Sequence, residues 1–258
     1  MTRLSLRPAL ALYAVLLSCL AATFALPLTA RAAGAATEAK PQARALTRQA
    51  ENLLLCGKCD QASPLLEQAC AISPGFLRPV GLKGLVCQLK GDDQGALDAY
   101  TAMECGTLAG PADQCSVLAR LCAEDVLLVN RDRAAHGLVM LRPHPMLALQ
   151  STRHCEEMRD MGYFDHESPV AAHATPMERF MELFSFRPYM IGENIAMRRG
   201  GDFALKLANV RITHDQLMNS PGHRANILGD KYTDVGVGLA ANERGDYWLC
   251  EEYVRFVP

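Results

Sequence analysis

The chain has 258 residues, half of them hydrophobic and 21% charged, and its formal net charge at pH 7 is −2. This length accommodates two small domains, or one domain with targeting and linker segments. No basic run or basic–aromatic patch occurs, so the composition argues against a nucleic-acid partner.

Residues 1–32 are predicted to be an export signal. Arg3 and Arg7 supply a positive start, residues 9–28 carry no charge, and Ala30-Arg31-Ala32 offers a small-x-small cleavage site. The next segment, residues 33–42, is rich in alanine and predicts a short linker.

Two alternatives to a cleaved signal stay open. About 20 uncharged residues are just enough to span a bilayer as a retained anchor. Leu16-Leu17-Ser18-Cys19 resembles a bacterial lipobox, so a lipid anchor through Cys19 is the second alternative. All three interpretations place the rest of the chain outside the cytoplasm. We therefore expect a secreted or periplasmic protein that is not an integral membrane protein after processing.

Ten cysteines fit an oxidising compartment, where thiols persist as disulfides. Removal of the signal leaves nine, an odd number that requires at least one free thiol or a bond between chains. Cys155 and Cys250 are candidates for a disulfide between the first long helix and the last strand of the C-terminal half. Two buried free thiols would give the same sequence pattern.

Residues 43–123 contain an internal repeat. Gly57 and Gly91 are 34 residues apart, and so are Ala62 and Ala96. Each copy reads as an apolar helix, a glycine turn and a second apolar helix. A period of 34 with small residues at these offsets resembles the tetratricopeptide repeat. The repeats would form either a groove for a protein partner or a spacer of helical hairpins.

The C-terminal half changes to helices followed by strands, which is typical of an α+β fold. Pro143 and Pro145 open one helix, and Asp202 is suited to cap another. Two β-rich runs follow at 235–239 and 247–256.

Three short polar motifs place a titratable residue beside glycine or proline, where the backbone can aim a side chain into a cleft. They are Tyr163-Phe164-Asp165-His166-Glu167-Ser168-Pro169, Gly192-Glu193-Asn194-Ile195-Ala196 and Asn219-Ser220-Pro221-Gly222-His223-Arg224-Ala225-Asn226-Ile227-Leu228. Each motif alone is weak evidence. In this order they resemble the CAP superfamily of cysteine-rich secretory, antigen 5 and pathogenesis-related proteins, in particular the SCP domain of its bacterial secreted branch.

The resemblance implies an α-β-α sandwich over residues 124–258, with a central antiparallel sheet and a wide cleft. His166 and His223 would face each other across this cleft, with Glu193 beside them. Many family members have a second acid before the last motif, and Asp215 is the candidate for this fourth cleft position. His214 precedes Asp215 on the inward stripe of the helix that follows Asp202. We expect it to be buried in the core with its hydrogen bonds satisfied.

Two neutral imidazoles and one carboxylate are suited to bind a divalent cation, above all zinc. We therefore predict that His166, His223 and Glu193 bind a cation or a small ligand, with Glu193 as third ligand or as base. A secreted hydrolase acting on peptide, ester or cell-envelope bonds with the same three residues is the alternative. A structural or interaction module with an inert cleft is a further alternative. The resemblance does not decide between them, because one scaffold carries unrelated functions.

Overall fold

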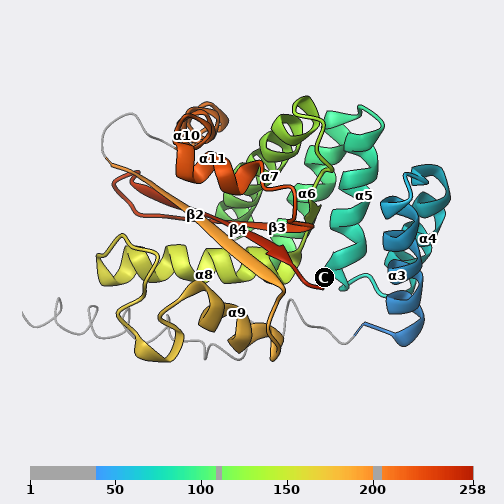
Figure 1. Ribbon diagram of the computed structural model, residues 1–258, viewed down its shortest axis with the longest axis horizontal. Coiled ribbons are helices and arrows are strands. Elements are labelled where there is room, and N and C mark those ends of the chain that lie inside the picture. The colour runs from blue at the N-terminus through green and yellow to red at the C-terminus, as the bar shows by residue number, and fades with distance from the viewer. Residues whose placement is uncertain (1–38, 109–111, 200–204, 258) are drawn as a thin grey trace, which may run out of the picture.

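The computed structural model describes residues 39–108, 112–199 and 205–257, the side chains of 112–115 excepted (Figure 1). The predicted export signal, Cys19 and most of the predicted linker lie outside these ranges. Within them, no helix combines the length and the apolar character that a membrane crossing needs.

A four-stranded sheet occupies the middle of the C-terminal half, in the order β1-β3-β4-β2. Its strands are β1 (Arg142–Pro143), β2 (Met190–Arg198), β3 (Asp234–Ala241) and β4 (Tyr247–Arg255). Strand β4 runs antiparallel to both of its neighbours, whereas the two-residue β1 is parallel to β3. The three long strands are the antiparallel sheet that the family resemblance implies, and β1 adds a short parallel edge.

Helices cover both faces of this sheet (Figure 1). On one side lie α8 (Pro145–Met161), the 3-10 turn η1 (Ala171–His173) and α9 (Pro176–Phe184). On the other side lie α7 (Ala112–Ala135), α10 (Leu207–Asn219) and α11 (Pro221–Ile227). The predicted α-β-α sandwich and the mixed fold class are confirmed.

Helix α8 packs directly on β3 because β3 has glycine where the helix crosses it. A Cβ atom at Gly238 would lie 2.0 Å from the backbone nitrogen of Thr152, and Gly236 makes a similarly close approach. The helix begins at Pro145, whose ring is pre-set for the first turn, and ends at Gly162 with a left-handed φ of 74°. Close contact between α8 and the sheet places the loop after α8 beside β2.

Four helices precede the sandwich, and each packs against the next. They are α3 (Pro41–Leu55), α4 (Cys59–Ile72), α5 (Leu77–Leu89) and α6 (Asp93–Thr107). Gly57 and Gly91 occupy the turns after α3 and α5 with φ of 70° and 79°, a conformation that favours glycine. Gly84 lets α5 approach α6, since a Cβ there would lie 2.4 Å from the Tyr100 ring. The helical hairpins are confirmed, and their assignment to the tetratricopeptide family stays a prediction.

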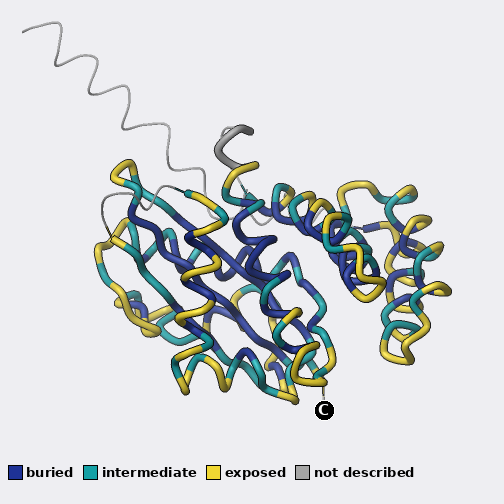
Figure 2. The backbone as a smooth tube through the Cα atoms, turned by 90° about the horizontal axis from the view of Figure 1, so that it is seen from above, coloured by how far each residue is buried: buried dark blue, intermediate teal, exposed yellow. Residues whose placement is uncertain are grey.

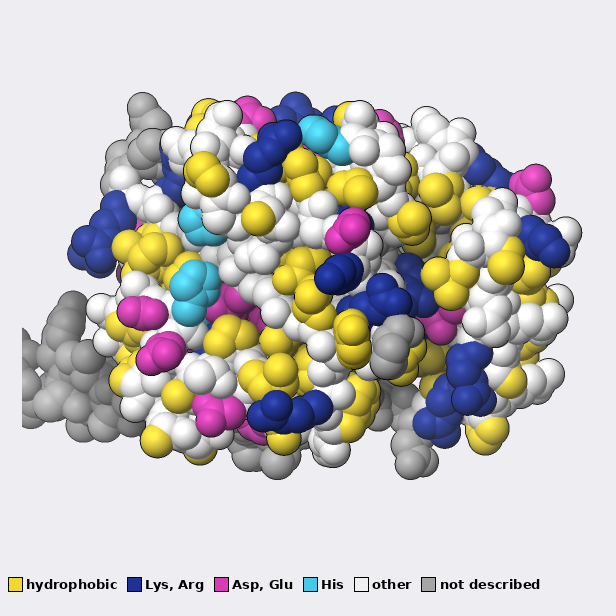
Figure 3. All heavy atoms as spheres, in the orientation of Figure 1, with side chains coloured by type: hydrophobic (Ala, Val, Ile, Leu, Met, Phe, Trp, Pro, Cys, Tyr) yellow, Lys and Arg dark blue, Asp and Glu magenta, His cyan; other side chains and the backbone are white. Residues whose placement is uncertain are grey.

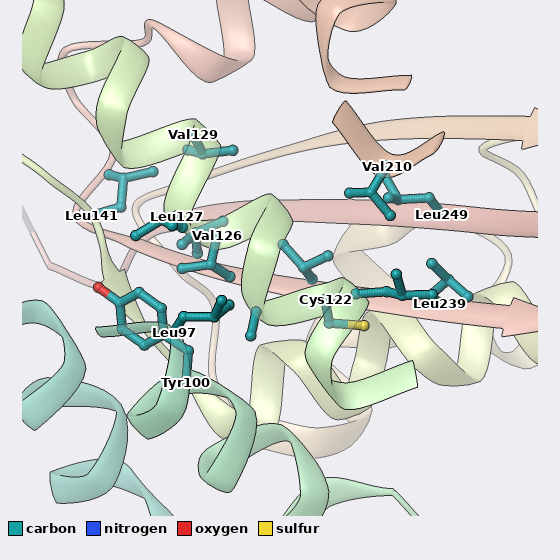
Figure 4. Close-up of a cluster of buried hydrophobic side chains, with 14 of the residues drawn as sticks. Leu97, Tyr100, Cys122, Val126, Leu127, Val129, Leu141, Val210, Leu239 and Leu249 are labelled. Carbon is teal, nitrogen blue, oxygen red and sulfur yellow. The ribbon is translucent and has the colours of Figure 1, made fainter. Parts of the chain in front are cut away.

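The largest buried apolar cluster joins these helices to the sheet (Figure 4). Leu97 and Tyr100 of α6 belong to the same cluster as Leu127 of α7 and Leu239 of β3. Figure 2 shows buried segments continuing from the sheet into the neighbouring helices. Helix α7 is continuous from 112 to 135, so the domain boundary predicted between residues 123 and 124 falls inside one helix.

Arg78 of α5 ties the helical region to the sheet edge. Its guanidinium donates to Asp234 Oδ1 at 2.6 Å, to Glu51 Oε1 of α3 at 2.8 Å and to the carbonyl of Pro143 at 2.9 Å. Arg142 donates to the other oxygen of Asp234 at 2.6 Å. Burial alone would raise the pKa of Asp234, but the charges of Arg78 and Arg142 lower it.

The structure shows no disulfide between Cys155 and Cys250, the pair considered from the sequence. Cys155 and Cys250 share one buried cluster. However, Cys155 donates to the carbonyl of Gly238 at 3.4 Å, and Cys250 donates to Glu193 Oε2 at 3.5 Å. The disulfide considered for this pair is therefore absent, since each thiol is a hydrogen-bond donor within the core.

Candidate functional site

The centre of the cleft is Glu193, a buried carboxylate on β2. His166 Nδ1 lies 2.9 Å from Glu193 Oε1, and Arg179 donates to Oε2 at 2.7 Å. The side chain of Glu193 is 1% exposed, whereas that of His166 is 48% exposed. A carboxylate held in the interior by Arg179 thus supports an imidazole that faces solvent.

These contacts set the protonation of the pair. The hydrogen bond with Glu193 raises the pKa of His166, and burial only partly opposes this rise. Burial alone would raise the pKa of Glu193, but the hydrogen bond with His166 and the charge of Arg179 lower it. Since the ionised carboxylate only accepts, His166 presents a protonated Nδ1 to it. The other ring nitrogen, Nε2, has no hydrogen-bond partner among the described residues.

His223 reaches the cleft from α11. Its Nδ1 is buried and has no hydrogen-bond partner in the described part of the chain. Burial and the charge of nearby His166 lower the pKa of His223, so its ring is neutral at neutral pH. Figure 3 shows two histidine side chains close together on the face that carries β2, with acidic side chains beside them.

Two asparagines fix the position of α11 relative to β2. Asn194 Nδ2 donates to the carbonyl of His223 at 3.1 Å. Asn226 Nδ2 donates to the carbonyl of Glu193 at 3.2 Å and to Asn194 Oδ1 at 2.9 Å. A Cβ at Gly192 would lie 2.2 Å from the Tyr232 hydroxyl, so a larger residue there would displace that side chain. The glycine and asparagine of the second motif therefore shape the cleft that its glutamate lines.

The loop that carries His166 is held by Glu157 of α8. The hydroxyl groups of Tyr163 and Ser168 both donate to Glu157 Oε1, Tyr163 at 2.5 Å. His173 Nε2 lies 2.7 Å from Glu157 Oε2. Three residues of one loop thus share one carboxylate, which orients the first motif toward β2.

Asp215, the candidate fourth cleft residue, lies on the exposed side of α10. It has no hydrogen bond or ion pair with any described residue. The buried stripe of α10 contains Thr213, His214 and Leu217, and Asp215 lies outside it. The donor atoms of His166, Glu193 and His223 do not all lie within 4.8 Å of one another, so these described residues are not a preassembled three-ligand set.

Two residues of the site were not predicted from the sequence. Arg179 is 6% exposed and donates both to Glu193 and to the carbonyl of His166. Its signal in the sequence is a lone cation within the apolar stripe of α9. Glu252 is the register partner of Glu193 on β4, and burial raises its pKa well above the usual range. Nothing in the sequence distinguishes Glu252 from the adjacent Glu251.

The α-β-α sandwich, with two histidines and a buried glutamate from the three motifs, has the features expected of an SCP domain. Residues 126–252 match the sequence model of the CAP family, described as the cysteine-rich secretory protein family. The C-terminal half of the chain therefore belongs to the CAP family, and the resemblance carried by the three motifs is confirmed.

The chain is similar to the uncharacterized protein YkwD of Bacillus subtilis (strain 168), at 33% identity over 123 residues. That match covers 48% of this chain and 43% of YkwD, so the chain spans less than half of the relative's length. A solved extracellular SCP-domain protein of Bacillus anthracis is similar at 24% identity and a TM-score of 0.47, covering 57% of this chain and 44% of that one. A cysteine-rich secretory protein of Staphylococcus aureus is similar at 16% identity and a TM-score of 0.37, covering 52% and 38%.

Proposed function

We propose that the CAP domain is an extracytoplasmic binding module whose cleft takes a divalent cation through His166 and His223. The observation that carries this proposal is the hydrogen bond of 2.9 Å between His166 Nδ1 and Glu193 Oε1. It fixes the tautomer and the orientation of the ring, and it leaves the lone pair of Nε2 for a ligand. Placement outside the cytoplasm rests on the predicted export signal.

The donor set fits a cation with two protein ligands. A carboxylate behind an imidazole is the common outer support of a metal-binding histidine. His223 contributes a neutral imidazole, the form that binds metals. Glu193 acts as a positioning residue, because its two oxygens are bonded to His166 and Arg179. A cation held in this way keeps open positions, through which it would polarise an oxygen of the bound ligand.

Zinc titration of the full chain, purified without a polyhistidine tag, tests this proposal. The double variant His166→Ala/His223→Ala is expected to bind about one zinc fewer per chain than the wild type. His136→Ala removes an exposed histidine and serves as the control, with wild-type binding expected. Equal stoichiometry and affinity in the wild type and the double variant would rule the proposal out.

A secreted hydrolase is the second candidate, favoured by the opposite pKa shifts of the two histidines. The pKa of His166 is raised and that of His223 is lowered, which suits an acid and a base acting together. Peptide, ester and cell-envelope substrates should then be turned over by the wild type and not by His223→Gln. Absence of turnover by the wild type on all three classes would leave the binding module as the function.

A further inference from the structure

A second cluster of ligand groups lies on the opposite face of the sheet from Glu193. Asp125 of α7, His214 of α10 and Glu251 of β4 are each at most 2% exposed. One donor atom from each of them lies within 4.8 Å of the other two. Side chains alternate across a strand, so Glu251 points toward α7 and α10, whereas Glu252 points toward α8. The cluster therefore shares no residue with the histidine pair of the cleft.

Four donor atoms of this buried cluster have no hydrogen-bond partner among the described residues. They are both carboxylate oxygens of Asp125, Oε1 of Glu251 and Nδ1 of His214. Asp125 Oδ1 and His214 Nδ1 are 3.6 Å apart, which is an ion-pair distance but longer than a hydrogen bond. Since nearly all buried polar atoms in proteins are hydrogen-bonded, four atoms without a hydrogen bond in one cluster indicate a ligand site.

The other polar atoms of Glu251 and His214 form hydrogen bonds within the protein. Glu251 Oε2 accepts from the Tyr253 hydroxyl at 2.6 Å and from Asn194 Nδ2 at 2.8 Å. His214 Nε2 lies 2.8 Å from Asp132 Oδ2, which orients the ring so that Nδ1 faces Asp125. Such outer hydrogen bonds orient the inner ligands of metal sites.

We propose that Asp125, His214 and Glu251 bind a divalent cation, zinc by preference, in the core beneath the cleft. One imidazole nitrogen and three carboxylate oxygens supply nitrogen and oxygen donors in the number that a closed structural zinc site uses. Two carboxylates also match the charge of the cation. Buried carboxylates without such a partner carry a large desolvation cost, which the cation offsets.

The proposed cation site adjoins the cleft through one side chain. Asn194 Nδ2 donates both to Glu251 Oε2 and to the carbonyl of His223. An ion that fixes Glu251 therefore also fixes the amide that positions α11. This inference uses none of the cation ligands of the proposed function, and the two can be tested apart.

The test uses the full chain as the His166→Ala/His223→Ala variant without a polyhistidine tag, so that the cleft histidines cannot contribute. After EDTA treatment, incubation with zinc chloride and gel filtration, elemental analysis is expected to find about one zinc per chain. Asp125→Asn in this background should reduce the content about tenfold or more. Asp215→Asn, which changes an exposed aspartate of α10, should leave it unchanged. A parent without zinc, or equal zinc in the parent and in Asp125→Asn, overturns the proposal.

A second measurement follows the thermal stability of the parent variant and does not depend on Asp125→Asn. Zinc at a hundredfold excess over Kd should raise the melting temperature of the parent variant by about 5 °C. Glu251→Gln in the same background should abolish this rise. A melting temperature that zinc does not change in the parent would overturn the proposal even if Asp125→Asn failed to fold.

Discussion

At the scale of single residues, Arg179 holds the cleft together from the inside. It donates to Glu193 Oε2 at 2.7 Å, and two of its nitrogens donate to the carbonyl of His166 at 3.1 and 3.2 Å. The same cation thus fixes the carboxylate and the loop that meets it. Because both ends of the ion pair are buried, loss of the arginine leaves a charge in the core without a partner.

Arg179→Met should therefore lower the free energy of unfolding by about 3–5 kcal/mol. Urea denaturation measures this change, and Arg187→Met, on an exposed neighbour beyond α9, should cost less than about 0.5 kcal/mol. Similar losses in the two variants would show that the buried pair contributes nothing to stability.

Glu193→Gln tests the other half of the pair. The amide carries no charge, so the pKa of His166 should fall relative to the wild type. The orienting hydrogen bond also weakens, and zinc binding in the cleft should drop about 10- to 100-fold. Titration of the His166 ring by NMR and calorimetry provide the two readouts. Glu167→Gln, an exposed change in the same loop, should alter neither, and an unshifted His166 in Glu193→Gln would contradict this account.

At the scale of elements, the contact between α8 and β3 places the first motif beside the second. Gly238→Ala would put a methyl group 2.0 Å from a backbone nitrogen of α8, which no side-chain movement can relieve. We expect a loss of about 3 kcal/mol or more in thermal or urea unfolding. Gly222→Ala, where a Cβ would meet nothing within 4 Å, is the matched control and should be tolerated. Equal tolerance of both would mean that α8 can shift away from the sheet.

Much of this element pattern was predictable from the sequence. Helix α8 and strands β3 and β4 have regular apolar periods, and their positions were predicted. Strand β2 was not, because Glu193 and Asn194 place polar groups on both of its faces and no alternation appears. Only the tertiary structure, which packs β2 against β4 and α11, gives these polar groups their partners.

The site itself was predictable only where a motif carried it. His166, Glu193 and His223 each belong to a recognisable motif. Arg179 lies in a separate helix, and its ion pair depends on how α9 docks against β2. Asp215 was a candidate for the fourth cleft position, and its place depends on the rotation of α10, which leaves it exposed to solvent.

At the scale of the whole molecule, Asp234 is the junction between the helical region and the sandwich. Its folded-state pKa is lowered, so its contribution to stability is present above its unfolded pKa of about 4 and is lost as pH falls through the folded value. Asp234→Asn should therefore be clearly less stable than the wild type at pH 7. The difference should shrink as the pH falls from about 4 through the lowered folded pKa, because the unfolded chain binds the proton first and the folded carboxylate binds it last. Unfolding curves across pH 2–8 measure it, and a difference independent of pH would exclude the ion pairs as its cause.

The continuity of helix α7 limits where the chain can be recombined with other modules. The middle of α7 lies in the apolar core that joins α6 to the sheet. The family match begins at residue 126, inside this helix, so a break in the chain at that residue would disrupt the core. Recombination at that point would sever an apolar helix and expose both pieces. We therefore expect that the sandwich can be exchanged for another module only at joints outside helix α7.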